Sequence, residues 1–311
     1  MRIGVMGTGA LGGYFGGRLA AAGVDVALVA RGAMLEALRS DGLRVESPLG
    51  DLHLPDVSAS DDPAEIGPVD AVLFLVKLPD TESAAEALAP MLGPETAVLT
   101  FQNGVTSCDR IASVVGAQRV IPGAAYIPAD VRAPGVVRHS AQTCRVEFGE
   151  IDGRESARCA ALRDAFAAAG VDATLADDMP VRLWVKFTLL SAISAITALT
   201  RLPIGPIRDD PGCWSLLCEA VEETAAVARV ACLGYPDGQA ERTIAFLSGM
   251  PPGVRASMCD DIVRGRRLEL RDLSGAVARI GAAHDVPTPV HGMVARALAP
   301  YADGRPAAAL G

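Results

Sequence analysis

Apolar residues in the first half of the chain form short runs that alternate with longer segments of helical periodicity. Runs of five or six residues predict the strands Arg2–Met6, Asp25–Val29, Ala71–Val76, Ala97–Phe101 and Val120–Ala124. The segments between them predict helices over 10–22, 32–40, 81–91 and 105–115. Short apolar strands that alternate with helices are typical of a parallel, doubly wound α/β sheet with both faces covered.

Residues 135–149 have a different pattern. Gly135–Ser140 and Cys144–Gly149 alternate between apolar and polar residues, and a polar turn separates them. This pattern predicts an antiparallel hairpin at the edge of the sheet. A helix over 156–169 and a strand over 172–175 complete the predicted first domain, residues 1–176.

The remaining residues, 177–311, predict an all-helical domain. Helical periodicity covers residues 179–200, 211–233, 237–248, 253–265, 268–284 and 289–301. The predicted breaks are the proline- and glycine-containing segments 202–206, 234–236 and 250–253. The tail, Asp303–Gly311, is expected to be loose. Two domains of this kind predict an active site in the cleft between them.

Composition excludes several functional classes. A formal net charge of −9 argues against nucleic acid or an anionic membrane as the main partner. The seven cysteines have no paired spacing, which is typical of a cytoplasmic protein, and with the four histidines they form no metal-ligand set, so no metal is expected. The chain begins directly with a strand rather than a signal peptide. The most apolar run, Phe187–Leu199, is shorter than the roughly 20 residues that span a bilayer and predicts a buried helix.

A glycine-rich turn follows the first predicted strand. Gly7, Gly9 and Gly12 have the G-x-G-x-x-G spacing, between a strand and a helix and within a unit of about 30 residues. Gly7 allows a tight turn, Gly9 lets the backbone approach a pyrophosphate, and Gly12 allows close packing of helix and strand. This predicts a Rossmann domain that binds a dinucleotide at a helix N-terminus, although glycine can also serve such a turn for steric reasons alone. The predicted contacts are Gly7, Thr8, Gly9, Ala10, Leu11 and Gly12.

The end of the second strand indicates which dinucleotide is bound. NAD-binding folds usually carry an acid there to hold the ribose 2′-hydroxyl, but this chain has no acid between Val26 and Leu35 and has Arg31 instead. A guanidinium suits a 2′-phosphate, so NADP(H) is the predicted cofactor; the alternative is an ordinary surface arginine. Two further loops at strand ends carry Lys77 and Asn103, which are candidate ligand contacts or, alternatively, a solvated residue and a simple turn.

Lys186 is the candidate for the chemistry, because it lies in an otherwise apolar helix. A partly desolvated lysine has a lowered pKa and can donate a proton near neutral pH. The alternative is that the Lys186 ammonium reaches solvent and has no catalytic role. Ser257 and Glu269 lie farther along, in predicted helices with apolar faces.

Together these motifs resemble the ketopantoate reductase (2-dehydropantoate 2-reductase) family over nearly the whole chain. The matching segments are 3–13, Val29–Arg31, Val76–Lys77, Gln102–Gly104, Trp184–Lys186, Ser257–Met258 with Asp261, and Glu269 twelve residues after Ser257. The resemblance implies NADPH-dependent reduction of a 2-keto acid to a 2-hydroxy acid.

The resemblance also implies roles for individual residues. Lys186 would hydrogen-bond the keto oxygen and protonate the alkoxide, and Glu269 would bind a substrate hydroxyl, help to place Lys186 and adjoin the cofactor. Asn103 and Ser257 would hold substrate near its carboxylate, with Asn103 also at the cofactor. Arg31 and Lys77 would contact the cofactor.

The substrate half departs from the family pattern. Leu190 and Ser194 stand four and eight residues after Lys186, where the family typically carries Asn, and Val254 stands where an Asn often precedes the serine. These positions predict a more apolar substrate site, for 2-dehydropantoate or a related branched 2-keto acid. Two alternatives remain: another hydroxy-acid or opine-type dehydrogenase of the same architecture, and a non-catalytic NADPH-binding sensor. A homodimer is one possible state of the protein, and the sequence leaves the oligomeric state open.

Overall fold

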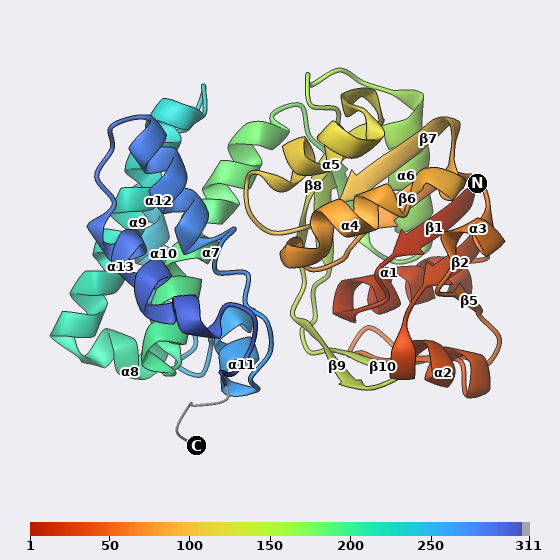
Figure 1. Cartoon of the computed structure of the whole chain (residues 1–311), viewed down its shortest axis with the longest axis horizontal. Helices are drawn as coiled ribbons and strands as arrows, with labels where there is room; N and C mark the ends of the chain where they lie inside the picture. The colour runs from red at the N-terminus through yellow and green to blue at the C-terminus, as the bar shows by residue number, and fades with distance from the viewer. Residues whose placement is uncertain (307–311) are drawn as a thin grey trace. The chain divides into compact units, whose positions relative to one another are not determined.

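The computed structural model describes residues 1–306 and divides into two compact units (Figure 1). The first contains residues 1–103 and 107–179, and the second contains residues 104–106 and the chain from Pro180 onward. The boundary predicted after residue 176 lies close to residue 179, where the chain passes into the second unit for the last time. The assignment of residues 104–106 to the second unit was not predicted from the sequence pattern. Residues 307–311 of the tail that was expected to be loose lie outside the described part.

An eight-stranded sheet forms the first unit, in the order β12-β11-β8-β7-β6-β1-β2-β5. The strands are β1 (Arg2–Met6), β2 (Asp25–Val29), β5 (Ser58–Ser60), β6 (Val69–Phe74), β7 (Leu92–Thr100), β8 (Val120–Tyr126), β11 (Arg145–Phe148) and β12 (Asp172–Leu175). Every neighbouring pair is parallel except β8 with β11. The chain winds from β1 through β2 to one side and from β6 through β7 and β8 to the other, so the predicted doubly wound sheet is confirmed.

Helices cover both faces of this sheet because successive strand side chains point to opposite sides. In β1, for example, Ile3 and Val5 belong to one buried cluster, with Phe15 of α1, while Met6 belongs to another, with Ile111 of α5. The helices of this unit are α1 (Ala10–Ala21), α2 (Gly32–Ser40), α3 (Pro63–Ile66), α4 (Thr81–Glu86), α5 (Ser107–Val115) and α6 (Ala157–Ala168), with short 3-10 turns η1 (Leu78–Asp80), η2 (Ala89–Met91) and η3 (Ala117–Arg119). The helix predicted over 81–91 is therefore wrong beyond Glu86, where the last residues form η2.

A second, four-stranded sheet corrects the prediction for residues 135–149. Its order is β4-β3-β10-β9, with β3 (Leu43–Glu46), β4 (Leu52–Leu54), β9 (Ala129–Ala133) and β10 (Val136–His139). The predicted hairpin is wrong, because β10 pairs with β9 and β3 while β11 pairs with β8 and β12 in the large sheet. Alternation identified both strands correctly, but β10 forms its hairpin with the preceding β9, and β11 joins a different sheet.

The second unit is helical, as predicted. It contains α7 (Met179–Thr200), α8 (Ile204–Asp209), α9 (Pro211–Ala231), α10 (Gln239–Ser248), α11 (Ser257–Val263), α12 (Ser274–Ala283) and α13 (Pro289–Leu298), followed by η4 (Ala299–Tyr301). By length and composition α7 could cross a membrane, yet most of its apolar stretch is buried within the unit, in the core that also takes side chains from α9, α12 and α13.

Several boundaries in the helical unit differ from the prediction, among them the start of the helix predicted over 253–265, which begins at Ser257. Helix α8 begins inside the predicted break at 202–206, because the N–H groups of Ile204 and Gly205 donate to the carbonyls of Val254 (2.8 Å) and Pro252 (2.9 Å). A distant segment thus satisfies the N-terminal donors of this short helix. The helix predicted over 268–284 starts only at Ser274, so Glu269 lies on the connection between α11 and α12.

Candidate functional site

The carboxyl ends of four neighbouring strands meet where the strand order of the large sheet reverses. Met6 at the end of β1 lies opposite Val29 of β2 and Phe74 of β6, and Phe74 lies opposite Thr100 of β7. The segments that follow carry the glycine turn, Arg31, Lys77 and Asn103, so the structure brings the predicted residues of the first unit to one edge. In doubly wound sheets this edge is where ligands bind.

The glycines of the turn satisfy different geometric demands. Gly7 has φ +97°, and a Cβ there would lie 2.8 Å from the backbone nitrogen of Val76. A Cβ on Gly12 would collide with the carbonyl oxygen of Gly7, which explains how closely α1 can approach the turn. At Gly9, by contrast, an added Cβ would meet no heavy atom within 4 Å in the described residues beyond its neighbours along the chain. The backbone at Gly9 therefore faces open space, as a turn that receives a pyrophosphate requires.

Helix α1 begins at this open backbone. Gly9 is its N-cap, in an extended conformation, and the first helical bond joins the N–H of Gly13 to the carbonyl of Gly9 (2.8 Å). The N–H groups of Ala10, Leu11 and Gly12 precede that bond and point out of the helix end. The first turn of α1 has no acidic residue, so the positive end of the helix dipole is available to a phosphate.

Thr8 and Arg31 lie at the junction of the turn with β2. The hydroxyl and the backbone N–H of Thr8 both donate to the carbonyl of Val29, at 2.9 and 3.1 Å, and Thr8 is buried. Thr8 therefore ties the turn to the end of β2. Arg31, two residues after Val29, is exposed and forms the N-cap of α2.

The loops after β6 and β7 are joined by Gln102, whose role the sequence analysis missed. Its side-chain nitrogen donates to the carbonyl of Val76 (3.0 Å) and to the hydroxyl of Thr81 (2.9 Å). Lys77, between these two contacts, is exposed. Asn103 is half-buried. The next residue, Gly104, has a φ of +88° and is the first of the three residues 104–106. The sequence could have indicated this role, because a polar glutamine directly follows an apolar strand.

The remaining candidates belong to the helical unit. Lys186, Leu190 and Ser194 recur at every fourth residue of α7 and therefore lie along one side of that helix. Lys186 and Leu190 are half-buried, and Leu190 packs against the helical core. Ser194 is 1% exposed, and its hydroxyl has no hydrogen-bond partner among residues 1–306. The i, i+4 spacing places the Lys186 ammonium beside the Leu190 alkyl group on this side of α7.

Ser257 lies at the start of α11, and Glu269 lies beyond its end. Ser257 is exposed and is the first residue of α11. Glu269 is half-buried on the connection to α12, where its carbonyl accepts hydrogen bonds from the N–H groups of Asp272 (3.1 Å) and Leu273 (3.0 Å). The interpretation of Glu269 as a helical residue is therefore wrong, but its backbone is held by the start of α12.

Comparisons with known proteins agree with this arrangement. The family model "Ketopantoate reductase PanE/ApbA" matches residues 3–153, and the model of its C-terminal domain matches residues 178–302. A 2-dehydropantoate 2-reductase of Mesorhizobium japonicum is 33% identical over 310 residues, which cover 93% of this chain and 94% of the relative.

Solved structures give the same picture. The crystal structure of a PanE/ApbA family ketopantoate reductase from Ralstonia eutropha superimposes with a TM-score of 0.89 at 34% identity, over 97% of this chain and 98% of that one. A D-mandelate dehydrogenase in complex with NADH and anilino(oxo)acetate has a TM-score of 0.87 over 97% of this chain and 98% of that one, but at 20% identity this likeness shows the fold alone. The chain belongs to the ketopantoate reductase family, which is a family of nicotinamide-dependent reductases.

Proposed function

We propose that this protein reduces a branched 2-keto acid, 2-dehydropantoate or a close relative, to the 2-hydroxy acid with NADPH, and that Lys186 is the proton donor. The observation that carries the proposal is the edge of the large sheet, where an open glycine backbone and a helix N-terminus adjoin an exposed arginine. Family membership supports the reaction type, because the similar proteins are named as 2-dehydropantoate 2-reductases.

The preference for NADPH rests on Arg31. Its position at the N-cap of α2, directly after β2, is where an acid would bind the ribose 2′-hydroxyl of NAD. A guanidinium pairs with phosphate through two parallel hydrogen bonds, and it would leave the uncharged ribose of NADH with no such partner. Lys77, on the neighbouring loop, adds a second cation for the anionic cofactor.

The proposed chemistry needs a cation and a proton at the keto oxygen. The nicotinamide cofactor supplies the hydride when bound. As the carbonyl carbon accepts it, negative charge develops on the oxygen, where the Lys186 ammonium stabilises the charge and then donates a proton. Asn103 and Ser257 would hold the substrate carboxylate, and the Glu269 carboxylate would bind a substrate hydroxyl and help to place the ammonium.

The substrate proposal rests on Leu190. A leucine side chain cannot pair with a hydroxyl, and a buried polar group left unpaired costs about 1–3 kcal/mol. An alkyl group on the substrate would match this position better than a hydroxyl. Val254, the other departure from the family pattern, has a structural task as well, because its carbonyl accepts the first N–H of α8.

The test is NADPH oxidation with a panel of 2-keto acids that differ in branching and in hydroxyl groups. We expect turnover with branched members, and we expect Lys186→Ala to lower kcat by about a hundredfold or more while the NADPH Kd stays nearly unchanged. A Lys186→Ala variant with half the wild-type rate would reject the proton-donor role. Binding of NADPH without turnover of any keto acid would instead favour the sensor alternative. The cytoplasmic location, suggested by seven free cysteines, belongs to the same proposal.

A further inference from the structure

The loop that carries Lys77 is held from two sides. We call residues 75–80, between β6 and α4, the Lys77 loop. Gln102 donates to the carbonyl of Val76 (3.0 Å), and the Nη2 atom of Arg110 donates to the carbonyl of Leu78 (3.0 Å). The residues on either side of Lys77 therefore have their carbonyls fixed by side chains from the loop after β7 and from α5.

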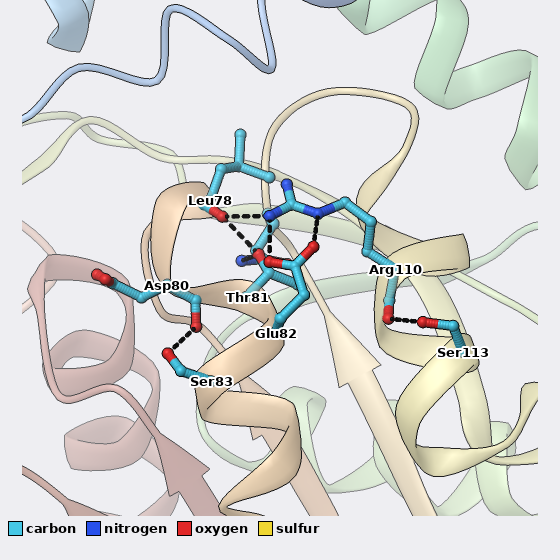
Figure 2. Close-up of polar contacts among 8 residues, drawn as sticks. Leu78, Asp80, Thr81, Glu82, Ser83, Arg110 and Ser113 are labelled. Carbon is cyan, nitrogen blue, oxygen red and sulfur yellow. Dashed lines mark hydrogen bonds and ion pairs between the residues drawn. The ribbon is translucent and has the colours of Figure 1, made fainter. Parts of the chain in front are cut away.

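Arg110 reaches the loop as part of a larger contact with α4 (Figure 2). Its guanidinium makes a forked pair with Glu82, in which Nε donates to Oε1 and Nη2 to Oε2, both at 2.6 Å. These hydrogen bonds from Arg110 hold the pKa of Glu82 below its usual value. One planar group thus joins α5, the first turn of α4 and the Lys77 loop, whereas a lysine at position 110 has no planar fork with which to pair with the carboxylate through two parallel hydrogen bonds.

Thr81 closes the network between Gln102 and Arg110. Its hydroxyl donates to the same Leu78 carbonyl (2.8 Å) and accepts from the side chain of Gln102 (2.9 Å). The contacts of Gln102, Thr81 and Arg110 converge on the backbone around Lys77. The exposed Lys77 side chain is therefore carried by a backbone that is held on both sides.

We propose that Arg110 is a positioning residue for the cofactor: by holding the Leu78 carbonyl it sets the place from which Lys77 meets NADPH. This inference rests on the proposed function, since it requires the cofactor to lie at the carboxyl edge of the sheet. Its energetic basis is preorganisation, because a loop already held in its binding conformation loses less entropy when the ligand arrives.

The chain provides a matched control in Arg158. Its guanidinium also makes a forked pair with one carboxylate, Glu150 (2.7 and 2.6 Å), and also donates to one backbone carbonyl, that of Gln118 (2.7 Å). Gln118 precedes β8, so this pair lies at the amino end of a parallel strand, away from the carboxyl edge. Loss of Arg158 removes the same kinds of interaction without touching the Lys77 loop.

The experiment compares Arg110→Met, Arg110→Lys, Lys77→Met, the Arg110→Met/Lys77→Met double variant and Arg158→Met. NADPH affinity is measured by fluorescence titration, with kcat, the KM for NADPH and the melting temperature of each protein. We expect Arg110→Met to raise the Kd and the KM about tenfold, the effect of losing one hydrogen bond to a charged group, with a far smaller change in kcat. Arg110→Lys should show most of this loss, while Arg158→Met should lower the melting temperature and leave the Kd unchanged.

Coupling between the two positions decides the inference. If Arg110 acts through Lys77, Arg110→Met adds little in the Lys77→Met background. Three results would each overturn the inference: additive effects of the two substitutions, an unchanged Kd in Arg110→Met, and an Arg110→Lys protein that binds NADPH like wild type. If Arg110→Met does not fold, the Arg110→Lys variant still tests the inference. A second arm, Glu82→Gln/Arg110→Met, should stay as weak as Arg110→Met. Recovery there would show that Arg110 serves only to neutralise Glu82, which also overturns the inference.

Failure of the proposed function has a different signature. If wild-type protein binds no NADPH, or if Lys77→Met binds it normally, the assignment of the cofactor site is wrong. If Lys77→Met weakens binding and Arg110→Met does not, the site stands and only the role of Arg110 is rejected.

Discussion

A buried histidine in the helical unit should make the stability of that unit depend on pH. His291 of α13 is fully buried, with Nε2 3.0 Å from the carbonyl oxygen of Ala220 and 2.9 Å from the hydroxyl of Thr224. Its Nδ1 lies 3.2 Å from the hydroxyl of Ser274. Because a carbonyl only accepts, Nε2 carries the proton of the neutral ring and Nδ1 accepts from Ser274. Burial lowers the pKa of His291 from 6.5 to about 4.

The sign and size of the effect follow from linkage. As pH falls below 6.5, the unfolded chain binds a proton at this histidine while the folded chain does not until about pH 4. The free energy of unfolding therefore falls over this window and is highest above it. Lowering the pKa of His291 from 6.5 to about 4 corresponds to a loss of about 3 kcal/mol in the free energy of unfolding across this pH window.

Glu223 acts in the opposite direction and must be separated from His291. Its carboxylate accepts the backbone N–H groups of Val290 (2.7 Å) and His291 (3.0 Å), and desolvation raises its pKa. A raised carboxyl pKa gives stability that is present at low pH and is lost as pH rises through the folded value. The comparison of wild type with His291→Gln cancels this contribution.

The assay is urea unfolding followed by tryptophan fluorescence at several pH values from about 4.5 to 7.5. Both tryptophans of the chain, Trp184 in α7 and Trp214 in α9, lie in the helical unit, so the signal reports that unit. We expect the wild-type unfolding free energy to fall more steeply with decreasing pH than that of His291→Gln. His284→Gln, at an exposed position in the same unit, should follow wild type. Equal pH slopes in wild type and His291→Gln would refute the reasoning, whatever their absolute stabilities.

Three further predictions concern the candidate site. NADPH should bind at least about ten times more tightly than NADH, and Arg31→Ala should remove the difference; calorimetric titrations that give equal affinities for wild type would contradict this. Leu190→Asn should shift kcat/KM toward 2-dehydropantoate over an alkyl-branched 2-keto acid by about tenfold, the effect of one recovered hydrogen bond. A loss of thermal stability without such a shift would mean that Leu190 only packs α7. Gly9→Val should block NADPH binding with little change in melting temperature. Gly12→Ala should lower the melting temperature, because its Cβ would meet the Gly7 carbonyl. Equal melting temperatures of the two variants would count against separate roles for the two glycines.

Local patterns in the sequence determined much of the first unit. Strands β1 and β2 lie where the apolar runs predicted, because the parts of a strand that are buried on both faces of a parallel sheet are apolar, as Ile3–Met6 and Ala27–Val29 are. The glycine turn was equally readable, since its spacing lies within the first βαβ unit, although the atoms that crowd Gly7 belong to the distant Val76. For the same reason the candidate cofactor residues could be named before their positions were known.

Only the tertiary structure decided which distant segments pair. The alternation in β10 and β11 was correctly identified, yet the two strands belong to different sheets, because β10 pairs with the adjacent β9 and the distant β3 while β11 pairs with β8 and β12. Helix α8 forms inside a predicted break because the segment 252–254 satisfies its first N–H groups. The hydrogen bond from Arg110 to the Lys77 loop and the burial of His291 also depend on segments that are distant in the sequence. Periodicity reports which side of an element is buried, whereas hydrogen bonds between distant residues exist only once the chain has folded.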